Sequence, residues 1–150
     1  MYQRILVPFD GSDTSTRGLD EAIRMAKLTG ARLRLVYLVD DLLYASGFET
    51  YAAYTNDVLP MVRAVGDKVM KEGQARVERA GVAVETAVVE GVAMRLADVV
   101  AEQVRSWNAD LIVIGSHGRR GVGRMLLGSD AEQIMRSASV PVLLVHAAAA

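Results

Sequence analysis

The sequence predicts an α/β fold built on a parallel β-sheet, and three observations favour it. Short runs of aliphatic and β-branched residues recur along the 150-residue chain, and most of them are unbroken by polar residues. The segments between them carry apolar residues at the i, i+3, i+4, i+7 spacing of an amphipathic helix. Glycines and a proline stand at the boundaries. Because unbroken apolar strands are typical of parallel sheets covered on both faces, we expect a single domain of three layers.

The first strand, helix and second strand are the clearest elements. The strand Arg4–Phe9 leads into a helix that Ser12 or Asp13 can cap and that Gly30 ends. One buried face of this helix is expected to carry Leu19, Ala22, Ile23 and Ala26. The second strand is Leu33–Val39.

The middle of the chain is less regular. The segment Asp40–Pro60 contains several aromatic residues without a clear period, and we expect a long, partly helical excursion over the top of the sheet. A helix follows over Met61–Ala80, with Gly81 at its end. The run Val82–Val89 is a weaker third strand, and Gly91 separates it from the next helix.

The last third of the chain predicts two strands and two helices. The third long helix is expected to bury a face formed by Ala93, Leu96, Ala97, Val100 and Val104. The strand Leu111–Ile114 then precedes a glycine-rich segment and a helix that begins near Ser129. Pro141 opens the final strand, Pro141–Val145, because its missing N–H is tolerated at a strand start. We expect one domain over residues 1–146 and a featureless tail over 147–150.

Composition excludes several classes of protein. Lys and Arg together number 17 against 18 Asp and Glu, so the basic excess of a nucleic-acid-binding protein is missing. The sequence has no cysteine, which excludes disulfides, thiolate metal sites and cysteine catalysis. No apolar run approaches the roughly 20 residues that span a bilayer, and the start does not resemble a signal peptide. We therefore expect a cytoplasmic protein that binds neither nucleic acid nor membrane.

The segment Gly115–Ser129, GSHGRRGVGRMLLGS, is the most informative part of the sequence. It follows a strand directly and runs into a helix, and ligands of open α/β sheets bind beyond the carboxyl ends of strands. Glycines let backbone N–H groups approach a phosphate, and the following helix N-terminus favours an anion. Arg119, Arg120 and Arg124 add positive charge. The segment indicates either a phosphate site or a structural loop, because a single glycine-rich motif is a weak signal.

A structural role is also available for Ser129. The sequence Ser-Asp-Ala-Glu from Ser129 to Glu132 has the form of a capping box, in which Ser129 caps the helix and Glu132 reaches back. A capping role and a phosphate contact can coexist on one residue. The segment is neither a Walker A motif nor the dinucleotide-binding fingerprint.

The order and spacing of these motifs resemble the nucleotide-binding branch of the universal stress protein family. Gly115-x-x-Gly118, nine further residues and then Gly128-Ser129 match the ATP-binding signature of that branch. Other segments resemble its landmarks in the right order: ILVPFDGSDTS, LVYLVDD, VVEG, ADLIVIGSHGRRG and SVPVLLV. The resemblance covers nearly the whole chain except Asp40–Pro60. It implies a five-stranded parallel sheet of order 3-2-1-4-5, with the nucleotide between the ends of the first and fourth strands.

The resemblance also implies a set of site residues. Pro8 and Asp10 would lie at the ribose and adenine side, and the backbone of Val39 would meet the adenine. Gly115 would approach the ribose, and the phosphates would be held by Gly118, Gly128, Ser129 and the amide of Asp130. Structural alternatives exist for two of these residues: Asp10 suits a turn or cap, and Val39 suits ordinary strand packing.

Asp130 departs from the family pattern, in which an apolar residue follows the Gly-Ser pair. A carboxylate beside phosphates repels them unless Mg²⁺ bridges the two groups. Alternatively, Asp130 interacts favourably with the dipole of the helix and points to solvent.

The sequence contains no clear set of catalytic residues. His117 lies inside the glycine-rich segment, where it is a candidate phosphate contact or proton donor, but no partner for acid–base work is evident. His146 is expected to be structural. We therefore predict a stress-response nucleotide receptor or sensor that binds ATP, rather than a dedicated enzyme. The alternatives are a slow ATPase or nucleotide-dependent transferase, within the wider superfamily of adenine-nucleotide α hydrolases, and an interaction module with an empty pocket.

The last strand also predicts a partner. Val140–Val145 is apolar and expected at the edge of the sheet, where an exposed strand invites pairing. We expect a symmetric homodimer in which this strand pairs with its copy, as the family resemblance also implies.

Overall fold

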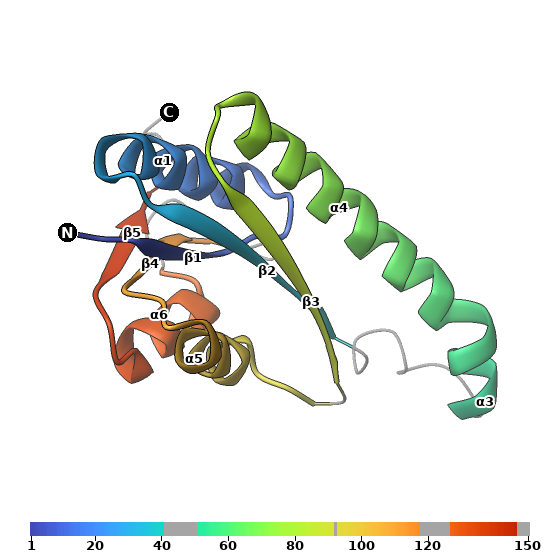
Figure 1. Cartoon of the computed structure of the whole chain (residues 1–150). Helices are drawn as coiled ribbons and strands as arrows, with labels where there is room; N and C mark the ends of the chain where they lie inside the picture. The colour runs from blue at the N-terminus through green and yellow to red at the C-terminus, as the bar shows by residue number, and fades with distance from the viewer. Residues whose placement is uncertain (41–50, 92, 118–126, 147–150) are drawn as a thin grey trace.

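The protein is a five-stranded sheet between two layers of helices (Figure 1). The structure is a computed structural model that describes residues 1–40, 51–91, 93–117 and 127–146. The strands are β1 (Arg4–Pro8), β2 (Arg32–Asp40), β3 (Val84–Gly91), β4 (Leu111–Gly115) and β5 (Val142–Val145). All neighbouring strands run parallel, in the order β3-β2-β1-β4-β5. The predicted fold class and strand order are confirmed.

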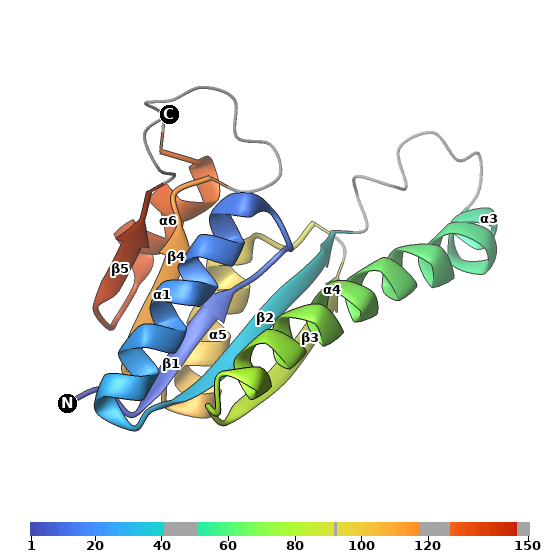
Figure 2. The same cartoon turned by 90° about the horizontal axis from the view of Figure 1, so that it is seen from above.

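The helices divide between the two faces of the sheet. They are α1 (Asp13–Thr29), α3 (Tyr51–Ala53), α4 (Leu59–Arg79), α5 (Leu96–Trp107) and α6 (Ser129–Ser137), with a π-helical stretch η1 (Tyr54–Val58) between α3 and α4. In Figure 1, α1 and α4 cover one face, and α5 and α6 cover the other. Figure 2 shows that α4 continues beyond the ends of β2 and β3, so that α3 lies outside the sheet.

The core explains why the central strands have no polar face. Ile5 and Val7 of β1 pack in the cluster beneath α1 and α4, whereas Leu6 belongs to the cluster beneath α5 and α6. All five residues of β4 are buried. Helices cover both faces of these strands, so residues that point to either face are buried and apolar. The alternation of polar and apolar residues that marks a half-exposed sheet is therefore missing from them.

Several predicted boundaries hold. Ser12 is the N-cap of α1, and its Oγ accepts a hydrogen bond from the Ser15 N–H at 3.2 Å. Gly30 is the C-cap with φ of 74°. Gly81 follows the C-cap of α4 and also has a positive φ, 75°. In both places the left-handed conformation favours glycine.

Three predictions need correction. Ala93 does not belong to the buried face of α5, because that helix begins at Leu96 and Ala93 has φ of 58°. β3 begins at Val84 rather than Val82, since Val82 still bonds to the end of α4, with its N–H donating to the carbonyl of Val77. Pro141 precedes β5, although its carbonyl already accepts the Ile112 N–H. In the excursion, residues 51–60 are helical as expected in part, and residues 41–50 lie outside the described residues.

Among the described residues, none of the helices is both long enough and apolar enough to cross a bilayer.

A polar cluster fastens α5 to β2 and β3. The Arg34 guanidinium donates to Glu85 at 2.7 Å and to Gln103 at 3.1 Å, and it lies 4.8 Å from the ring centroid of Trp107. The Trp107 indole N–H donates to the second Glu85 carboxylate oxygen at 2.7 Å. The hydrogen bond from Arg34 is the main cause that lowers the pKa of Glu85 below its ordinary value of 4.5, with Trp107 and Arg32 acting in the same direction and burial opposing them.

We predict that Glu85→Gln weakens the fold and flattens the acid side of its stability profile. A carboxyl whose pKa is lowered by folding stabilises the protein above its unfolded pKa, and this stabilisation is lost as pH falls through the folded value. The variant should therefore lose about 1 kcal/mol at neutral pH. Below the ordinary glutamate value, the free energies of unfolding of variant and wild type should converge.

Urea unfolding followed by the fluorescence of the single tryptophan, Trp107, measures this at a series of pH values. Glu102→Gln is the control, because Glu102 pairs with Arg105 on the exposed surface of α5. Equal effects of the two substitutions at every pH would contradict the prediction.

Candidate functional site

The candidate site lies where β1 and β4 end side by side. These neighbouring strands are parallel, so both carboxyl ends meet the same edge of the sheet. After β1 the chain enters α1 on one face, and α6, which follows β4 in the chain, covers the other face (Figure 1). Figure 2 shows the amino ends of α1 and α6 at this same edge. This is the switch point at which open α/β sheets bind ligands.

At the amino end of α1, the side chains of Asp10, Ser12 and Ser15 accept hydrogen bonds from nearby backbone N–H groups. Asp10 follows β1, and its Oδ1 accepts the Ser12 N–H at 2.9 Å, while the Asp10 N–H donates to Ser15 Oγ at 3.4 Å. Ser12 caps the helix. Asp10 therefore has the turn role that was the structural alternative for it. Pro8, the last residue of β1, is buried beside it.

The end of β4 touches α1 without an intervening side chain. A Cβ on Gly115 would lie 2.5 Å from the carbonyl oxygen of Thr14, and a Cβ on Gly18 would lie 3.1 Å from the Gly115 nitrogen. Both contacts are with backbone atoms, which cannot rotate away. Packing between α1 and β4 thus requires glycine at position 115, whether or not a ligand approaches it.

Ser116 joins the two ends of the glycine-rich segment. Its N–H donates to the Val145 carbonyl at 2.9 Å, and its carbonyl accepts the Gly128 N–H at 2.7 Å. The chain thus leaves β4 and returns to it at Gly128. Gly118 lies outside the described residues.

The start of α6 differs from the predicted capping box. Gly128 is the N-cap, with φ of −60° and ψ of 145°, and no side chain caps the helix among the described residues. Ser129 is the first helical residue, and the Glu132 N–H donates to the Gly128 carbonyl at 3.0 Å. The capping box is therefore wrong, because the chain turns into the helix one residue earlier. The side chains of Ser129 and Asp130 are exposed.

The backbone of Val39 turns away from the site, and that of Leu38 turns towards it. The Arg32 N–H donates to the Gln3 carbonyl, and the Val36 carbonyl accepts the Phe9 N–H, so even-numbered residues of β2 direct their backbone groups towards β1. The Leu33 N–H donates to the Ala83 carbonyl, so odd-numbered residues, Val39 included, face β3. The side chain of Val39 is buried, with an exposed fraction of 1%. β1 ends at Pro8, opposite Val36, whereas β2 continues to Asp40.

The described residues therefore assemble most of the predicted set at one edge: Pro8, Asp10, Gly115, Gly128, Ser129 and Asp130. Sequence reasoning gave no role to Leu38, whose backbone groups face the β1 side, or to Gly18 and Ser116, which make backbone contacts at this edge. Strand alternation could have identified Leu38, whereas Gly18 and Ser116 gave no distinctive signal. Within the described parts of the chain, no three His, Asp or Glu side chains are grouped as metal ligands would be.

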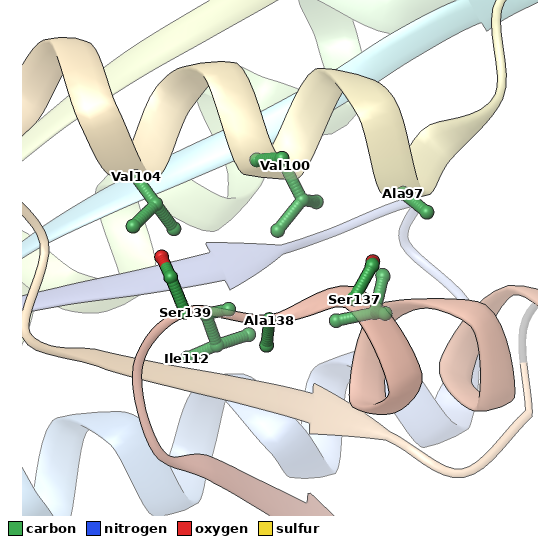
Figure 3. Close-up of a pocket in the computed structure, with 9 residues that line it drawn as sticks. Ala97, Val100, Val104, Ile112, Ser137, Ala138 and Ser139 are labelled. Atoms are coloured by element: carbon green, nitrogen blue, oxygen red, sulfur yellow. The ribbon is translucent and has the colours of Figure 1, made fainter.

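A cavity between α5, α6 and β4 is a packing gap rather than a ligand site (Figure 3). Figure 3 shows Val100 and Val104 of α5 facing Ile112 and Ala138 across it. Its volume of about 10 Å³ is at the lower limit for one water molecule.

The sequence model described as the Universal stress protein family matches residues 1–146. A curated universal stress protein of Methanocaldococcus jannaschii is 35% identical over 147 residues, covering 97% of this chain and 82% of that protein. Among solved structures, a universal stress protein family member from Burkholderia pseudomallei is 34% identical with a TM-score of 0.77, over 97% of both chains.

Some structures with this fold contain nucleotides. A universal stress protein in complex with cAMP is 27% identical with a TM-score of 0.66, over 98% of both chains. Two more distant structures share the fold with TM-scores of 0.69. One is from Archaeoglobus fulgidus in complex with dAMP, at 18% identity, and the other is from Arabidopsis thaliana with AMP bound, at 16%. They cover 97% and 98% of this chain and 98% and 93% of their own.

We predict that Gly115→Ala destabilises the protein by about 2–3 kcal/mol, since a methyl group there forces two backbones apart. Gly30→Ala is the control: nothing lies within 4 Å of its added Cβ, and only its φ of 74° is unfavourable, which costs about 1 kcal/mol. Denaturant unfolding compares the two. A smaller loss for Gly115→Ala than for Gly30→Ala would contradict the close packing of α1 on β4.

Proposed function

Because the chain belongs to the universal stress protein family, we propose that it is an adenine-nucleotide receptor whose site is the shared edge of β1 and β4. ATP is the proposed ligand, with its phosphates at the start of α6 and its base beside β2. The protein acts by binding and reporting the nucleotide rather than by rapid turnover.

The open amino end of α6 is the observation that carries this proposal. Both α1 and α6 begin at the same edge, but only α1 has a side-chain cap among the described residues. The first amides of a helix need acceptors, and the helix dipole makes an anion the favoured one. Gly128 presents no side chain in front of these amides, and its bond to Ser116 holds them against the end of β4.

The base is proposed to lie against the exposed edge of β2. Beyond Phe9, the N–H and C=O of Leu38 point to the space above the end of β1, one a donor and the other an acceptor. Adenine offers an acceptor at N1 and a donor at N6, whereas guanine offers the reverse at the corresponding positions. The Leu38 backbone therefore suits adenine, and we propose it in place of Val39. Pro8 and Asp10 would lie at the ribose and adenine side.

The nucleotide-bound relatives support the class of ligand. The protein in complex with cAMP is 27% identical to this chain over nearly all of its length, and the dAMP and AMP complexes share the fold. All three ligands carry adenine and phosphate. A role for Mg²⁺ remains a separate proposal, with exposed Asp130 as the bridging carboxylate.

We predict that nucleotide-free protein binds ATP and AMP and that Gly128→Val weakens both by about 10- to 100-fold. The φ and ψ of Gly128, −60° and 145°, are accessible to valine, so the fold should survive while the side chain obstructs the amides. Calorimetric titration measures the affinities, and GMP in place of AMP should bind at least tenfold more weakly.

Gly81→Asn is the matched control, because it changes a glycine at the opposite edge of the sheet and asparagine tolerates a positive φ. ATP titrations with and without Mg²⁺, on wild type and Asp130→Asn, separate the two roles considered for Asp130. A wild type that binds no adenine nucleotide would overturn the proposed function and favour an interaction module. Release of phosphate during the titration would favour a slow ATPase.

We also propose a homodimer formed through β5. β5 is an edge strand, and the bonds from Ile112 to Pro141 and from Ser116 to Val145 direct its odd-numbered backbone groups to β4. The groups of Val142 and Leu144 thus face outward, where a second copy can pair with them.

We predict that Leu144→Pro abolishes this dimer, because proline removes an outward N–H and leaves the bonds to β4 in place. Light scattering should give twice the 16.2 kDa subunit mass for wild type and the subunit mass for the variant. Leu144→Ala, which keeps the N–H, should remain dimeric. A wild type of one subunit mass would refute the proposed assembly.

A further inference from the structure

Ser116 is fixed in place by burial and by two backbone hydrogen bonds. Its side chain is buried, with an exposed fraction of 1%, and its backbone bonds fix it to Val145 and to Gly128. Its hydroxyl oxygen lies 2.9 Å from Nδ1 of His117. The orientation of the His117 ring is therefore set by a group that is itself fixed on both sides.

The other ring nitrogen of His117 has no hydrogen-bond partner within the part of the chain that the structure describes. Nε2 is buried, and it makes no hydrogen bond to any of the described residues. A buried polar atom without a partner is rare in folded proteins and calls for a specific explanation. This nitrogen belongs to the residue that follows Ser116 at the edge of β4, beside the chain that returns at Gly128.

The hydroxyl favours one tautomer of the ring. If the Ser116 O–H donates to Nδ1, the hydroxyl proton is satisfied and the ring proton sits on Nε2. If Nδ1–H donates instead, the hydroxyl proton needs an acceptor, and none is found among the described residues. Since an unsatisfied buried donor is costly, the first arrangement is favoured. It turns Nε2 into a donor that needs an acceptor.

We propose that Ser116 is a positioning residue that fixes the Nε2–H tautomer of His117, and that this N–H donates to a phosphate oxygen of the bound nucleotide. The inference rests on the proposed nucleotide site. An anionic oxygen is the strongest acceptor for a buried N–H, and the open amino end of α6 favours an anion at the same edge. This hydrogen bond would contribute to the affinity for the phosphate group and not to the affinity for the base.

The tautomer is tested first, without ligand, by ¹⁵N NMR of the histidine rings at about pH 8, where imidazole side chains are ordinarily neutral. The chain has two histidines, so His146→Gln assigns the spectrum. We expect the proton of His117 on Nε2 and an Nδ1 resonance shifted by an accepted hydrogen bond. Ser116→Ala should remove that shift, and Ser116→Thr, which keeps a hydroxyl, should restore it. A proton on Nδ1, or an Nδ1 resonance indifferent to Ser116→Ala, would overturn the inference.

Binding is tested with AMP, adenosine and inorganic phosphate. His117→Phe should weaken AMP about tenfold and leave adenosine unchanged, whereas His117→Gln, which keeps a donor near Nε2, should lose far less. Ser116→Ala should weaken AMP a few-fold, with recovery in Ser116→Thr. AMP and phosphate, but not adenosine, should shift the Nε2–H resonance.

The outcomes separate the two proposals. Equal weakening of AMP and adenosine by His117→Phe would contradict the phosphate contact while leaving the nucleotide site intact. A wild type that binds neither compound would overturn the proposed function and the phosphate contact with it. In that case the ligand-free spectrum still decides whether Ser116 fixes the ring.

Discussion

The site depends on the contact between the backbones of α1 and β4. Gly18 and Gly115 bring the first two turns of the helix against the end of the strand so closely that a methyl group on Gly115 would lie 2.5 Å from the Thr14 carbonyl oxygen. Because backbone atoms cannot rotate away, this contact fixes where the chain leaves β4. Ser116, the next residue, then transmits the position to Gly128 through one hydrogen bond of 2.7 Å. The start of α6 is thereby held relative to the end of β1, although the two are 120 residues apart by number, from Pro8 to Gly128.

The amino ends of α1 and α6, which meet at this edge, differ in the groups that lie beside their first backbone amides. In α1, Ser12 and Asp10 occupy amides that could otherwise face a ligand. In α6, the first turn carries Asp130 and Glu132, which interact favourably with the helix dipole when no ligand is bound. A phosphate at the same amides would meet their repulsion, but Asp130 is exposed and its charge is screened by water. The exposed carboxylate of Asp130 would therefore repel a bound phosphate less than a buried one would.

The sequence was sufficient to predict the fold, because the pattern of apolar runs indicates it, and the spacing of the glycines was enough to propose where a phosphate would bind. Runs such as LIVI at 111–114 have no polar face, which indicates a covered parallel strand, and the strand order came with the family resemblance. The glycines mark a place where backbone must come close to something. They do not identify the neighbouring group: at position 115 glycine is required because the backbone of Thr14 lies against it, whatever ligand binds. Local errors arose where tertiary bonds override propensity, as at Gly128, which takes the N-cap position that the capping-box pattern had given to Ser129.

The part of the proposed site that would bind the adenine base could not be predicted from residue types. The proposed contacts of Leu38 are made by its backbone, so any apolar residue would serve and no residue type marks the position. What selects Leu38 over Val39 is the direction of hydrogen bonds in β2, which the bonds from Phe9 to Val36 and from Leu33 to Ala83 determine. β1 must also stop at Pro8 while β2 continues to Asp40, or these groups would be occupied by the neighbouring strand. The specificity proposed for adenine therefore follows from a difference in strand length and from the alternation of backbone directions, and it would survive substitution of the side chain at position 38.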